Sequence, residues 1–470
     1  MKDKYSVVSL FSGAGGMDLG FKMEGNFKIL LANDILSPPA FTYAENFGHR
    51  VIDVGEFNQN AESSYSVYLL GDAAEIDFSR INNEVDVVIG GPPCQDFSIV
   101  RGNEKERLGI KVKRGRLYAH FIRALIHLQP KVFVFENVPG LKSANKGTAY
   151  KTILEDFSQL KLRWEEIKEI AGNSAPSRIE GYFVIFSGIV DSADLGVPQR
   201  RKRLIIIGVR NDLVSRSWLK INAVKQKVQS LLSGENSIFK KYPLTAVEVF
   251  EGRPIPELQN EYKKVMEEYK ETAEIVKTKK AEKWKREVWE KLTFDIIKDY
   301  LFVNNIKESS IKELDSAFHQ HAELLKELGY YGKPLEEREF PDRSNAVSKE
   351  IKSVLDRLKM IPPDENHEFV KGTEWEVEGR GISLIYRRLH PLKPSYTVVA
   401  YGGGGTWGYH YRRSRGKLTN RERARLQTFP DFFMFKGSSA EVRAQIGEAV
   451  PPLLGKKIAQ IVTLILTELE

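Results

Sequence analysis

Residues 5–20, with the sequence YSVVSLFSGAGGMDLG, join an apolar run to a glycine-rich turn and then to the start of a helical pattern. The run at 5–11 has the length and the β-branched content of a buried strand. Glycines at a strand-to-helix turn let a ligand approach the backbone closely, and the helix N-terminus offers it free N–H groups. The stretch is therefore typical of an α/β sheet that binds a nucleotide-like cofactor.

The same alternation continues to about residue 210. Short apolar runs separated by helical patterns predict a parallel α/β sheet. Besides 5–11, we expect strands at residues 27–32, 85–90, 132–136, 182–189 and 204–209. Each of the first four ends at a polar or glycine-rich turn, and open α/β sheets bind ligands at the carboxyl ends of their strands.

Composition limits the class of protein. The 470 residues are 41% hydrophobic and 29% charged, which fits a globular protein of two or three domains. No apolar run reaches 18 residues and the N-terminal run is too short for a signal peptide, so we expect neither a membrane nor a secreted protein. With 71 Lys and Arg against 63 Asp and Glu, the net charge of +8 permits a polyanionic partner.

The middle of the chain changes in character. Residues 253–328 are rich in Lys and Glu and contain no glycine. Apolar side chains recur there with a spacing of four, which predicts a helical insertion with one apolar face; they are Trp284, Val288, Leu292, Ile296 and Tyr300. A solvated arm that packs on its own domain is one interpretation, and contact with a partner or with DNA is the other. Residues 379–416 are rich in glycine, aromatics and arginine, and an amphipathic helix is expected at 453–469.

The glycine turn and two acidic residues indicate a cofactor pocket. Asp34 follows the second strand, where a carboxylate can accept both ribose hydroxyls, and Asp72 could reach an adenine amino group. The glycine spacing matches neither GxGxxG nor GxxxxGK[ST], which disfavours dinucleotides and nucleoside triphosphates. An adenosine without a polyphosphate fits better, and S-adenosylmethionine is the common example. A purely structural glycine turn is the alternative.

A second group of residues supplies reactive side chains. Cys94, the sole cysteine, excludes an intrachain disulfide and a Cys-based zinc site, and no metal is expected. It lies in a loop stiffened by Pro92 and Pro93, where a thiol is exposed to substrate. Glu136 ends an apolar strand, and desolvation should raise its pKa. Arg201 and Arg203 share a face of an extended segment and could hold a carbonyl oxygen or a phosphate, although a solvated basic patch is equally compatible.

These motifs, in this order, resemble the DNA (cytosine-5)-methyltransferases of bacterial restriction–modification systems. The resemblance covers roughly residues 5–210 and 380–465, and it is carried by FSGAGG (11–16), PPCQ (92–95), ENV (136–138), QRRKR (199–203), RERARLQTFPD (421–431) and QIGEAVP (445–451). It implies a Rossmann-like S-adenosylmethionine-dependent methyltransferase domain, residues 1–210 completed by 445–470. A smaller target-recognition domain would span 211–444, including the 253–328 insertion.

The resemblance also implies a mechanism. The Cys94 thiolate would attack C6 of a flipped-out cytosine, so that electron density develops at C5. Glu136 would protonate or bind N3, Arg203 would contact O2, and Arg201 would help to position the base or its phosphate. Cytosine C5 would then receive the methyl group of S-adenosylmethionine.

Further site residues are expected by the same resemblance. The cofactor would contact Phe11 through its adenine, Gly13 and Gly16 through its methionine part, and Asp34 through its ribose; the remaining cofactor residues are Ser12, Gly15, Asp72 and Pro92. Double-stranded DNA would contact Gln95, Ser98 and Thr397. The composition of the glycine tract at 402–405, with Arg412 and Arg413 after it, makes this segment the candidate DNA-facing loop, and a glycine-rich connection is the alternative. One departure is Glu448, which stands where relatives carry Asn.

Other functions stay open on the sequence. A tRNA cytosine-5 methyltransferase shares the fold, but that branch carries a Cys-Phe-Thr tripeptide and this chain has no second cysteine. A non-catalytic DNA-binding repressor derived from a methylase would not need Cys94, Glu136 and Arg203. A nicotinamide oxidoreductase fails on the glycine pattern. We expect a cytoplasmic, nucleoid-associated enzyme, with a cognate restriction endonuclease as its functional partner.

Overall fold

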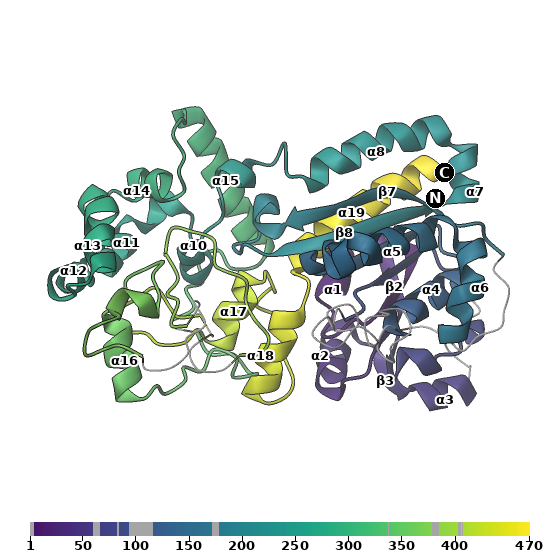
Figure 1. Cartoon of the computed structure of the whole chain (residues 1–470), viewed down its shortest axis with the longest axis horizontal. Helices are drawn as coiled ribbons and strands as arrows, with labels where there is room; N and C mark the ends of the chain where they lie inside the picture. The colour runs from purple at the N-terminus through teal and green to yellow at the C-terminus, as the bar shows by residue number, and fades with distance from the viewer. Residues whose placement is uncertain are drawn as a thin grey trace. The chain divides into compact units, whose positions relative to one another are not determined.

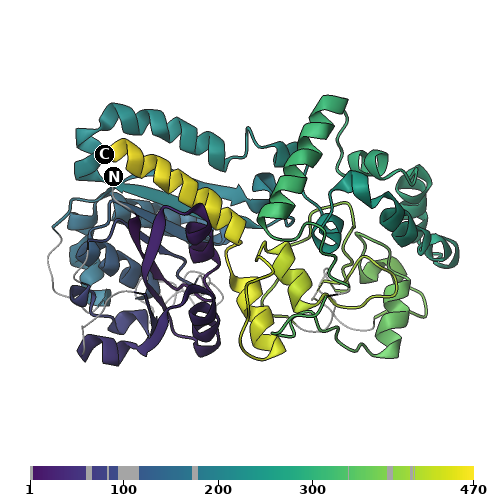
Figure 2. The ribbon, with the colours of Figure 1, turned by 180° about the vertical axis from the view of Figure 1, so that it is seen from behind.

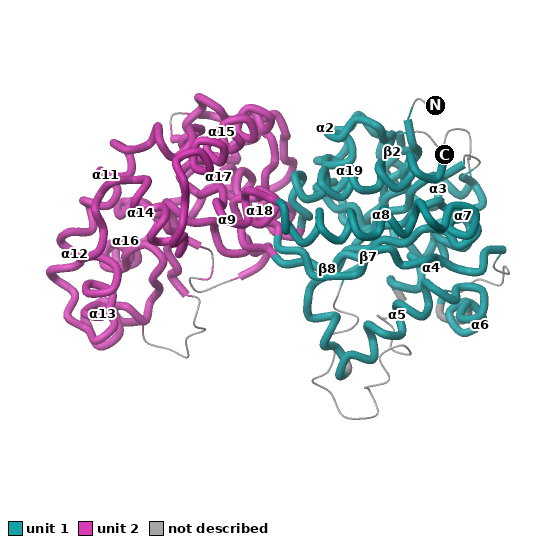
Figure 3. Tube along the Cα trace, turned by 90° about the horizontal axis from the view of Figure 1, so that it is seen from above, with its two compact units in different colours: residues 1–191, 202–236, 449–470 teal, residues 192–201, 237–448 magenta. Residues whose placement is uncertain are grey.

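The computed structural model describes residues 4–59, 66–81, 84–93, 116–171, 178–336, 338–377, 385–402, 406 and 408–470. The chain forms two compact units, which Figure 3 colours separately. Unit 1 comprises residues 1–191, 202–236 and 449–470, and unit 2 comprises 192–201 and 237–448. The limits of these units differ from the expected domain limits at 210 and 445, and the segment 192–201 belongs to unit 2. The division into a catalytic and a target-recognition domain remains a prediction.

Unit 1 is built on an eight-stranded sheet with the order β3-β4-β2-β1-β5-β6-β8-β7 (Figure 1). The strands are β1 (Tyr5–Leu10), β2 (Phe27–Asp34), β3 (Arg50–Asp53), β4 (Val67–Leu70), β5 (Val87–Gly90), β6 (Val132–Asn137), β7 (Tyr182–Asp191) and β8 (Lys202–Arg210). All six expected strands are confirmed, and the α/β fold class with them. The four-residue strands β3 and β4 were missed because such short segments carry no clear alternation.

The expectation of an all-parallel sheet is wrong at one strand. β8 runs antiparallel to both of its neighbours, β6 and β7, whereas every other pair is parallel. The physical reason is the connection, because only residues 192–201 join β7 to β8 and a parallel return needs a longer crossover. The carboxyl ends of β1, β2, β4, β5 and β6 still meet at one edge of the sheet.

Helices cover both faces of this sheet. They are α1 (Gly16–Glu24), α2 (Ser37–Phe47), α3 (Val54–Gln59), α4 (Arg116–Leu128), α5 (Thr148–Ser158), α6 (Leu160–Ala171), α7 (Asn211–Arg216), α8 (Trp218–Leu232) and α19 (Pro452–Leu469). The expected C-terminal helix is confirmed as α19, which packs beside α8 and against α1 (Figure 2). Among described residues, only 439–469 are long and apolar enough to cross a membrane, and 67% of the apolar window there is buried, as in a core helix.

The regular elements that the structure describes in unit 2 are helices. Its helices are α9 (Ile238–Lys241), α10 (Ala246–Glu251), α11 (Gln259–Glu267), α12 (Lys270–Ile275), α13 (Lys279–Glu287), α14 (Ile296–Val303), α15 (Ile311–Glu327), α16 (Lys352–Lys359), α17 (Asn420–Leu426) and α18 (Ser439–Glu448). The expected continuous helical face is wrong, because the chain leaves the helix after Glu287 and Phe294 adopts a left-handed φ of 58°. Trp284 instead packs with Trp289 and Phe369. The insertion packs on its own unit.

Candidate active site

The turn between β1 and α1 is shaped for a close approach to its backbone. Gly13 and Gly15 have φ of 53° and 84°, a region that favours glycine. A Cβ on Gly15 would lie 2.7 Å from the ring of Tyr43, and one on Gly16 would lie 2.3 Å from the carbonyl oxygen of Val450. A Cβ on Gly13 would meet no atom within 4 Å. The turn is thus packed from behind, and open at Gly13.

Asp34 lies beside this turn because β2 is the neighbour of β1. Its carboxylate accepts hydrogen bonds from the N–H groups of Gly13, at 3.0 Å, and Leu36, at 3.2 Å. Burial raises the pKa of Asp34 in spite of these two donors. Tyr68 donates from its hydroxyl to the Gly13 carbonyl oxygen at 3.0 Å, which fixes the turn from the β4 side. An acidic side chain is therefore held at the open part of the turn.

The other expected cofactor residues also lie at this edge. Phe11 is half-buried with φ 57°, and the Ser12 hydroxyl donates to the Ser9 carbonyl oxygen at 3.1 Å. The Asp72 carboxylate accepts from the Ala74 N–H at 2.9 Å and caps a short helix. Its expected reach to an adenine stays a prediction.

Behind the turn lies a buried carboxyl group that the sequence analysis missed. Asp18 is 1% exposed and accepts a hydrogen bond from the Tyr43 hydroxyl at 2.9 Å. Burial raises its pKa to about 6. An acidic residue in the first turn of a helix is common as a surface feature, so its residue type gave no signal of burial.

Glu136 and Arg203 form an ion pair between neighbouring strands. Glu136 comes from β6 and Arg203 from β8, and Nε of Arg203 lies 2.9 Å from Oε1 of Glu136. Their side chains are only 13% and 14% exposed. The ion pair therefore holds the carboxyl group of Glu136 and the guanidinium of Arg203 side by side.

The carboxylate of Glu136 also touches the loop that follows β5. An ideal Cβ on Gly91 would lie 2.6 Å from Oε2 of Glu136, and Asn137 donates from Nδ2 to the Pro92 carbonyl oxygen at 2.9 Å. The loop is therefore fixed against the end of β6 as far as Pro92. The expected nucleophile Cys94 and the expected DNA contacts Gln95 and Ser98 lie outside the described residues.

Arg201 has a different environment from Arg203. Its side chain is 1% exposed in unit 2, and its guanidinium donates to the carbonyl oxygens of Gly447 at 2.8 Å, Val398 at 3.2 Å and Glu448 at 3.3 Å. A guanidinium that donates to three carbonyl oxygens holds together the chain segments that carry them. In this conformation Arg201 is a positioning residue, and its expected contact with a base or phosphate is an untested prediction.

Gln199 completes this joint, and its role was not foreseen. Its amide donates to Oε1 of Gln427 at 2.8 Å and accepts from the Val398 N–H at 2.8 Å. Beside it, the Thr397 hydroxyl donates to the Arg200 carbonyl oxygen at 2.8 Å. One buried cluster of unit 2 thus brings together motifs that are far apart in the sequence, at 199–201, 397–398, 427 and 447.

Arg412 and Arg413 are held by carboxylates of unit 2. Arg412 lies 2.5 Å from Glu336 and 3.1 Å from Glu251, and Arg413 lies 2.9 Å from Glu271. Both side chains are less than a quarter exposed. These ion pairs favour a structural role, and the expected contacts with DNA remain untested. Within the expected DNA-facing loop, residues 403–405 and 407 lie outside the described part.

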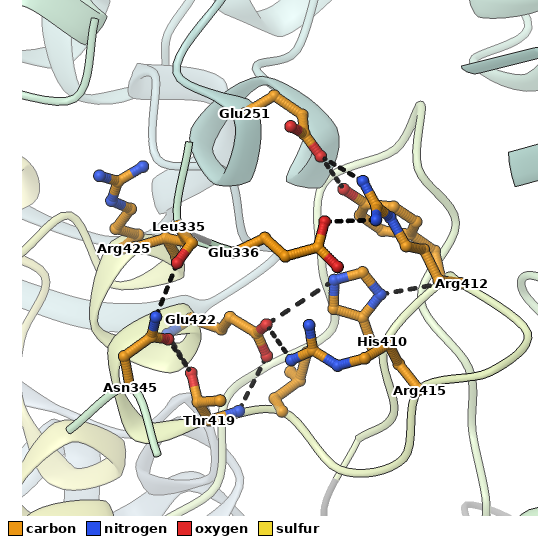
Figure 4. Close-up of polar contacts among 12 residues, drawn as sticks. Glu251, Leu335, Glu336, Asn345, His410, Arg412, Arg415, Thr419, Glu422 and Arg425 are labelled. Atoms are coloured by element: carbon orange, nitrogen blue, oxygen red, sulfur yellow. Dashed lines mark hydrogen bonds and ion pairs between the residues drawn. The ribbon is translucent and has the colours of Figure 1, made fainter. Parts of the chain in front are cut away.

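A buried polar network extends from these pairs (Figure 4). Burial and neighbouring arginines hold the pKa of His410 well below its usual value, so its ring is neutral and Nδ1 accepts from the Arg412 N–H at 3.0 Å. Glu422 binds Arg415 at 2.7 Å and the Thr419 N–H at 2.8 Å. The network fixes the segment 408–415 against α10 and α17.

The arrangement suits chemistry on a planar heterocycle. A carboxyl group and a guanidinium stand side by side at the carboxyl edge of the sheet, next to the loop that leads to the single thiol. Such a pair can contact a ring nitrogen and an exocyclic oxygen of one base. In the described part of the chain, no cluster of His, Cys, Asp and Glu suits a metal ion.

Comparison with known proteins gives concordant matches. The model of the C-5 cytosine-specific DNA methylase family matches residues 5–463. The chain is 57% identical over 459 residues to the DNA (cytosine-5-)-methyltransferase M.ApeKI of Aeropyrum pernix, covering 97% of this chain and 98% of that protein. It is 30% identical to the type II methyltransferase M.NgoFVII of Neisseria gonorrhoeae, covering 96% and 84%. A solved structure of a putative DNA modification methyltransferase encoded within an E. coli prophage shares the fold, with TM-score 0.52, 21% identity and coverage of 99% and 100%.

Proposed function

The chain belongs to the C-5 cytosine-specific DNA methylase family, and from that premise we propose that it methylates C5 of a cytosine within a specific double-stranded DNA sequence. The observation that carries this proposal is the Glu136–Arg203 pair, set against the loop that leads to Cys94. The family and the relative from Aeropyrum pernix are named for DNA methylation, so the tRNA-methylating and non-catalytic alternatives are not favoured.

The methyl donor of this family is S-adenosylmethionine, and the residues at the β1–α1 turn fit it. Open space above Gly13 leaves room for a ligand against the backbone, and Asp34 offers a carboxylate at the same place. We assign the donor to Phe11, Ser12, Gly13, Gly15, Gly16, Asp34, Asp72 and Pro92. When bound, it supplies an electrophilic methyl group.

The chain's own residues would perform the remaining chemistry. The Cys94 thiolate forms a bond to C6 of the flipped-out cytosine, and the ring becomes nucleophilic at C5. Arg203 binds O2 of the base, and Glu136, released from Arg203, takes up a proton from solvent and donates it to N3. After methylation a base removes the C5 proton, the C5–C6 double bond re-forms and Cys94 leaves as the thiolate, while N3 returns its proton to Glu136.

The biological setting follows from the same relatives. The type II name of M.NgoFVII implies a restriction–modification system, so we propose that a cognate endonuclease cuts the sequence that this enzyme protects. The enzyme would act in the cytoplasm, where its DNA substrate lies. Residues 211–444 would recognise the target sequence.

Bisulfite sequencing of plasmid DNA from a methylation-free host tests the function. We expect the wild type to protect cytosines in one short sequence context, and the Cys94→Ala variant to protect none while still binding that sequence. Complete conversion of cytosines in the wild-type sample would contradict DNA methylation. Protection by the Cys94→Ala variant would overturn the covalent mechanism alone.

A further inference from the structure

Unit 2 contains a cavity that neither the catalytic pair nor the cofactor turn uses. Its volume is about 500 Å³, which is in the range of ligand pockets. The residues around it come from the end of α14, from a turn at 364 and from the segment 387–397, together with Arg200. Its polar walls are formed by Arg200, Asn304, Asn305, Asp364, Arg387, His390, Lys393, Tyr396 and Thr397.

The charges in this cavity do not cancel. Asp364 lies 2.6 Å from Lys393 and also accepts from the Tyr396 hydroxyl, and these partners help to lower its pKa to about 2 despite burial. Lys393 therefore neutralises the one carboxylate of the walls. His390 adds no charge, because burial and Lys393 lower its pKa to about 3. Arg200 is itself paired with Asp194 at 2.8 Å, so the guanidinium of Arg387 is left in excess.

Arg387 differs from the other arginines of this region. Its guanidinium lies over the ring of Tyr396, and no carboxylate within 4 Å of it is found among the described residues. Arg412, Arg413 and Arg415, by contrast, are all paired with glutamates. The half-buried guanidinium of Arg387 stacks on an aromatic ring and faces the cavity. The stacking fixes its orientation, so its N–H groups can bind an anion.

The cavity is tied to the catalytic segment by the chain itself. Arg200 precedes Arg203 by three residues, which limits the separation of their Cα atoms to about 11 Å whatever the arrangement of the two units. Thr397, which lines the cavity, holds the Arg200 carbonyl oxygen through its hydroxyl. An anion in this cavity must therefore lie within a few nucleotide lengths of the reacting base.

We propose that this cavity binds a backbone phosphate of the DNA substrate close to the target cytosine, with Arg387 as its principal ligand and Arg200, Asn305 and Thr397 around it. The proposal rests on the proposed function, since it takes DNA as the polyanion. It makes Arg387 a positioning residue that fixes the register of the duplex without reading its sequence.

The salt dependence of DNA binding tests the role of the charge. Each phosphate neutralised on B-DNA contributes about −0.9 to the slope of log K against log salt. We expect Arg387→Gln to reduce this slope by about one for the sequence that bisulfite mapping identifies, and to weaken binding about 3- to 30-fold at 0.15 M salt. Arg387→Lys should restore most of the slope. Arg216→Gln is the matched control, because Arg216 is exposed in α7, which follows β8 at the opposite end of the sheet from Glu136.

Duplexes with a single neutral methylphosphonate linkage identify the phosphate. Wild type should lose affinity at one linkage near the target, and Arg387→Gln should be insensitive to that linkage alone. Equal sensitivity of both proteins at every linkage, or a slope change no larger than that of Arg216→Gln, would overturn the proposal. A third outcome would also overturn the proposal: binding of inorganic phosphate that depends on Arg387, with no loss of DNA affinity at any methylphosphonate linkage. The site would then hold a free anion. Methylation of DNA by the wild type is measured in parallel. If the wild type methylates DNA while the phosphate tests fail, the proposed phosphate site is wrong and the proposed function stands.

Discussion

At the scale of single residues, the Glu136–Arg203 pair bears on how a proton could reach N3 of the base. Arg203 contacts Oε1 of Glu136, while Oε2 lies against Gly91. A base that accepts a hydrogen bond from Arg203 through O2 would weaken the ion pair and bring N3 to the carboxyl group. Under the proposed function, the pair would couple binding of the base to proton transfer.

Replacing Glu136 by Gln tests this coupling. The amide keeps the shape of the side chain beside Gly91 but cannot supply a proton to N3. We expect turnover to fall about 10²- to 10⁴-fold, the usual contribution of a general acid, while the Kd for DNA stays within about threefold. The control is Glu180→Gln, which removes a carboxylate that is 72% exposed. Single-turnover methylation equal to that of the control would exclude Glu136 from the chemistry.

Asp18 gives a prediction about pH. Its folded pKa of about 6 exceeds the ordinary 3.8, so the folded state binds the proton more tightly. This stabilisation is complete below pH 3.8 and is lost as pH rises through 6, a change of about 3 kcal/mol. Asp18→Asn should therefore increase the free energy of unfolding by up to about 3 kcal/mol at pH 7.5, and the gain should disappear toward pH 4. Urea unfolding at the two pH values measures it, with exposed Asp315→Asn as the control that should show no pH-dependent difference.

The residue scale also shows where the sequence was sufficient. The positions of Gly13 and Asp34 follow from spacing along one strand–turn–helix unit, and the structure places both at one edge of the sheet; their roles toward a cofactor remain predictions. The surroundings of Arg201 and Arg412 could not be predicted in this way, because their acceptors lie 76 to 247 residues away in the chain. Residue type predicted an anion or base contact for each guanidinium, which remains untested; the carbonyl and carboxylate partners that the structure shows come from long-range packing.

At the scale of elements, periodicity identified buried strands better than it identified helices. Residues 204–209 read as a strand from their apolar content, but their direction depends on the short connection from β7. The spacing of Trp284, Val288 and Ile296 matched one helix, although a single left-handed residue at Phe294 divides the segment. Local patterns predict which side chains are buried, and tertiary packing decides whether a helix continues or ends.

The crossing of α1 and α19 depends on two glycines. A Cβ on Gly20 would lie 2.3 Å from the backbone of Gly455 and Lys456, so the helices cannot keep their separation if Gly20 carries a side chain. We expect Gly20→Ala to lower the free energy of unfolding by about 1 to 3 kcal/mol, as overpacking does. Chemical denaturation measures the effect. Gly140→Ala is the matched control, because a Cβ there meets nothing within 4 Å; equal stability of the two variants would mean that the crossing adjusts freely.

At the scale of the whole molecule, neither compact unit is a continuous stretch of chain. The chain passes between the units after residues 191, 201, 236 and 448. The ten residues 192–201 contribute to unit 2 the buried side chains of Ala193, Leu195 and Val197 as well as Gln199 and Arg201. Without them, the carbonyls of Val398 and Gly447 and Oε1 of Gln427 would lose the hydrogen bonds that Arg201 and Gln199 donate.

A fragment comprising residues 237–448 should therefore be unstable by itself and respond to the missing segment in trans. We expect a peptide of residues 192–201, at about 100 times its Kd, to stabilise the fragment by about 2.7 kcal/mol and raise its Tm by roughly 5 to 10 °C. The same peptide with Arg201→Gln should have little effect, since it leaves three carbonyl contacts unmade. Differential scanning calorimetry distinguishes the two peptides. An equal response to both would show that apolar burial alone holds the segment, and Arg201 would then be available for the contact with substrate that its residue type first suggested.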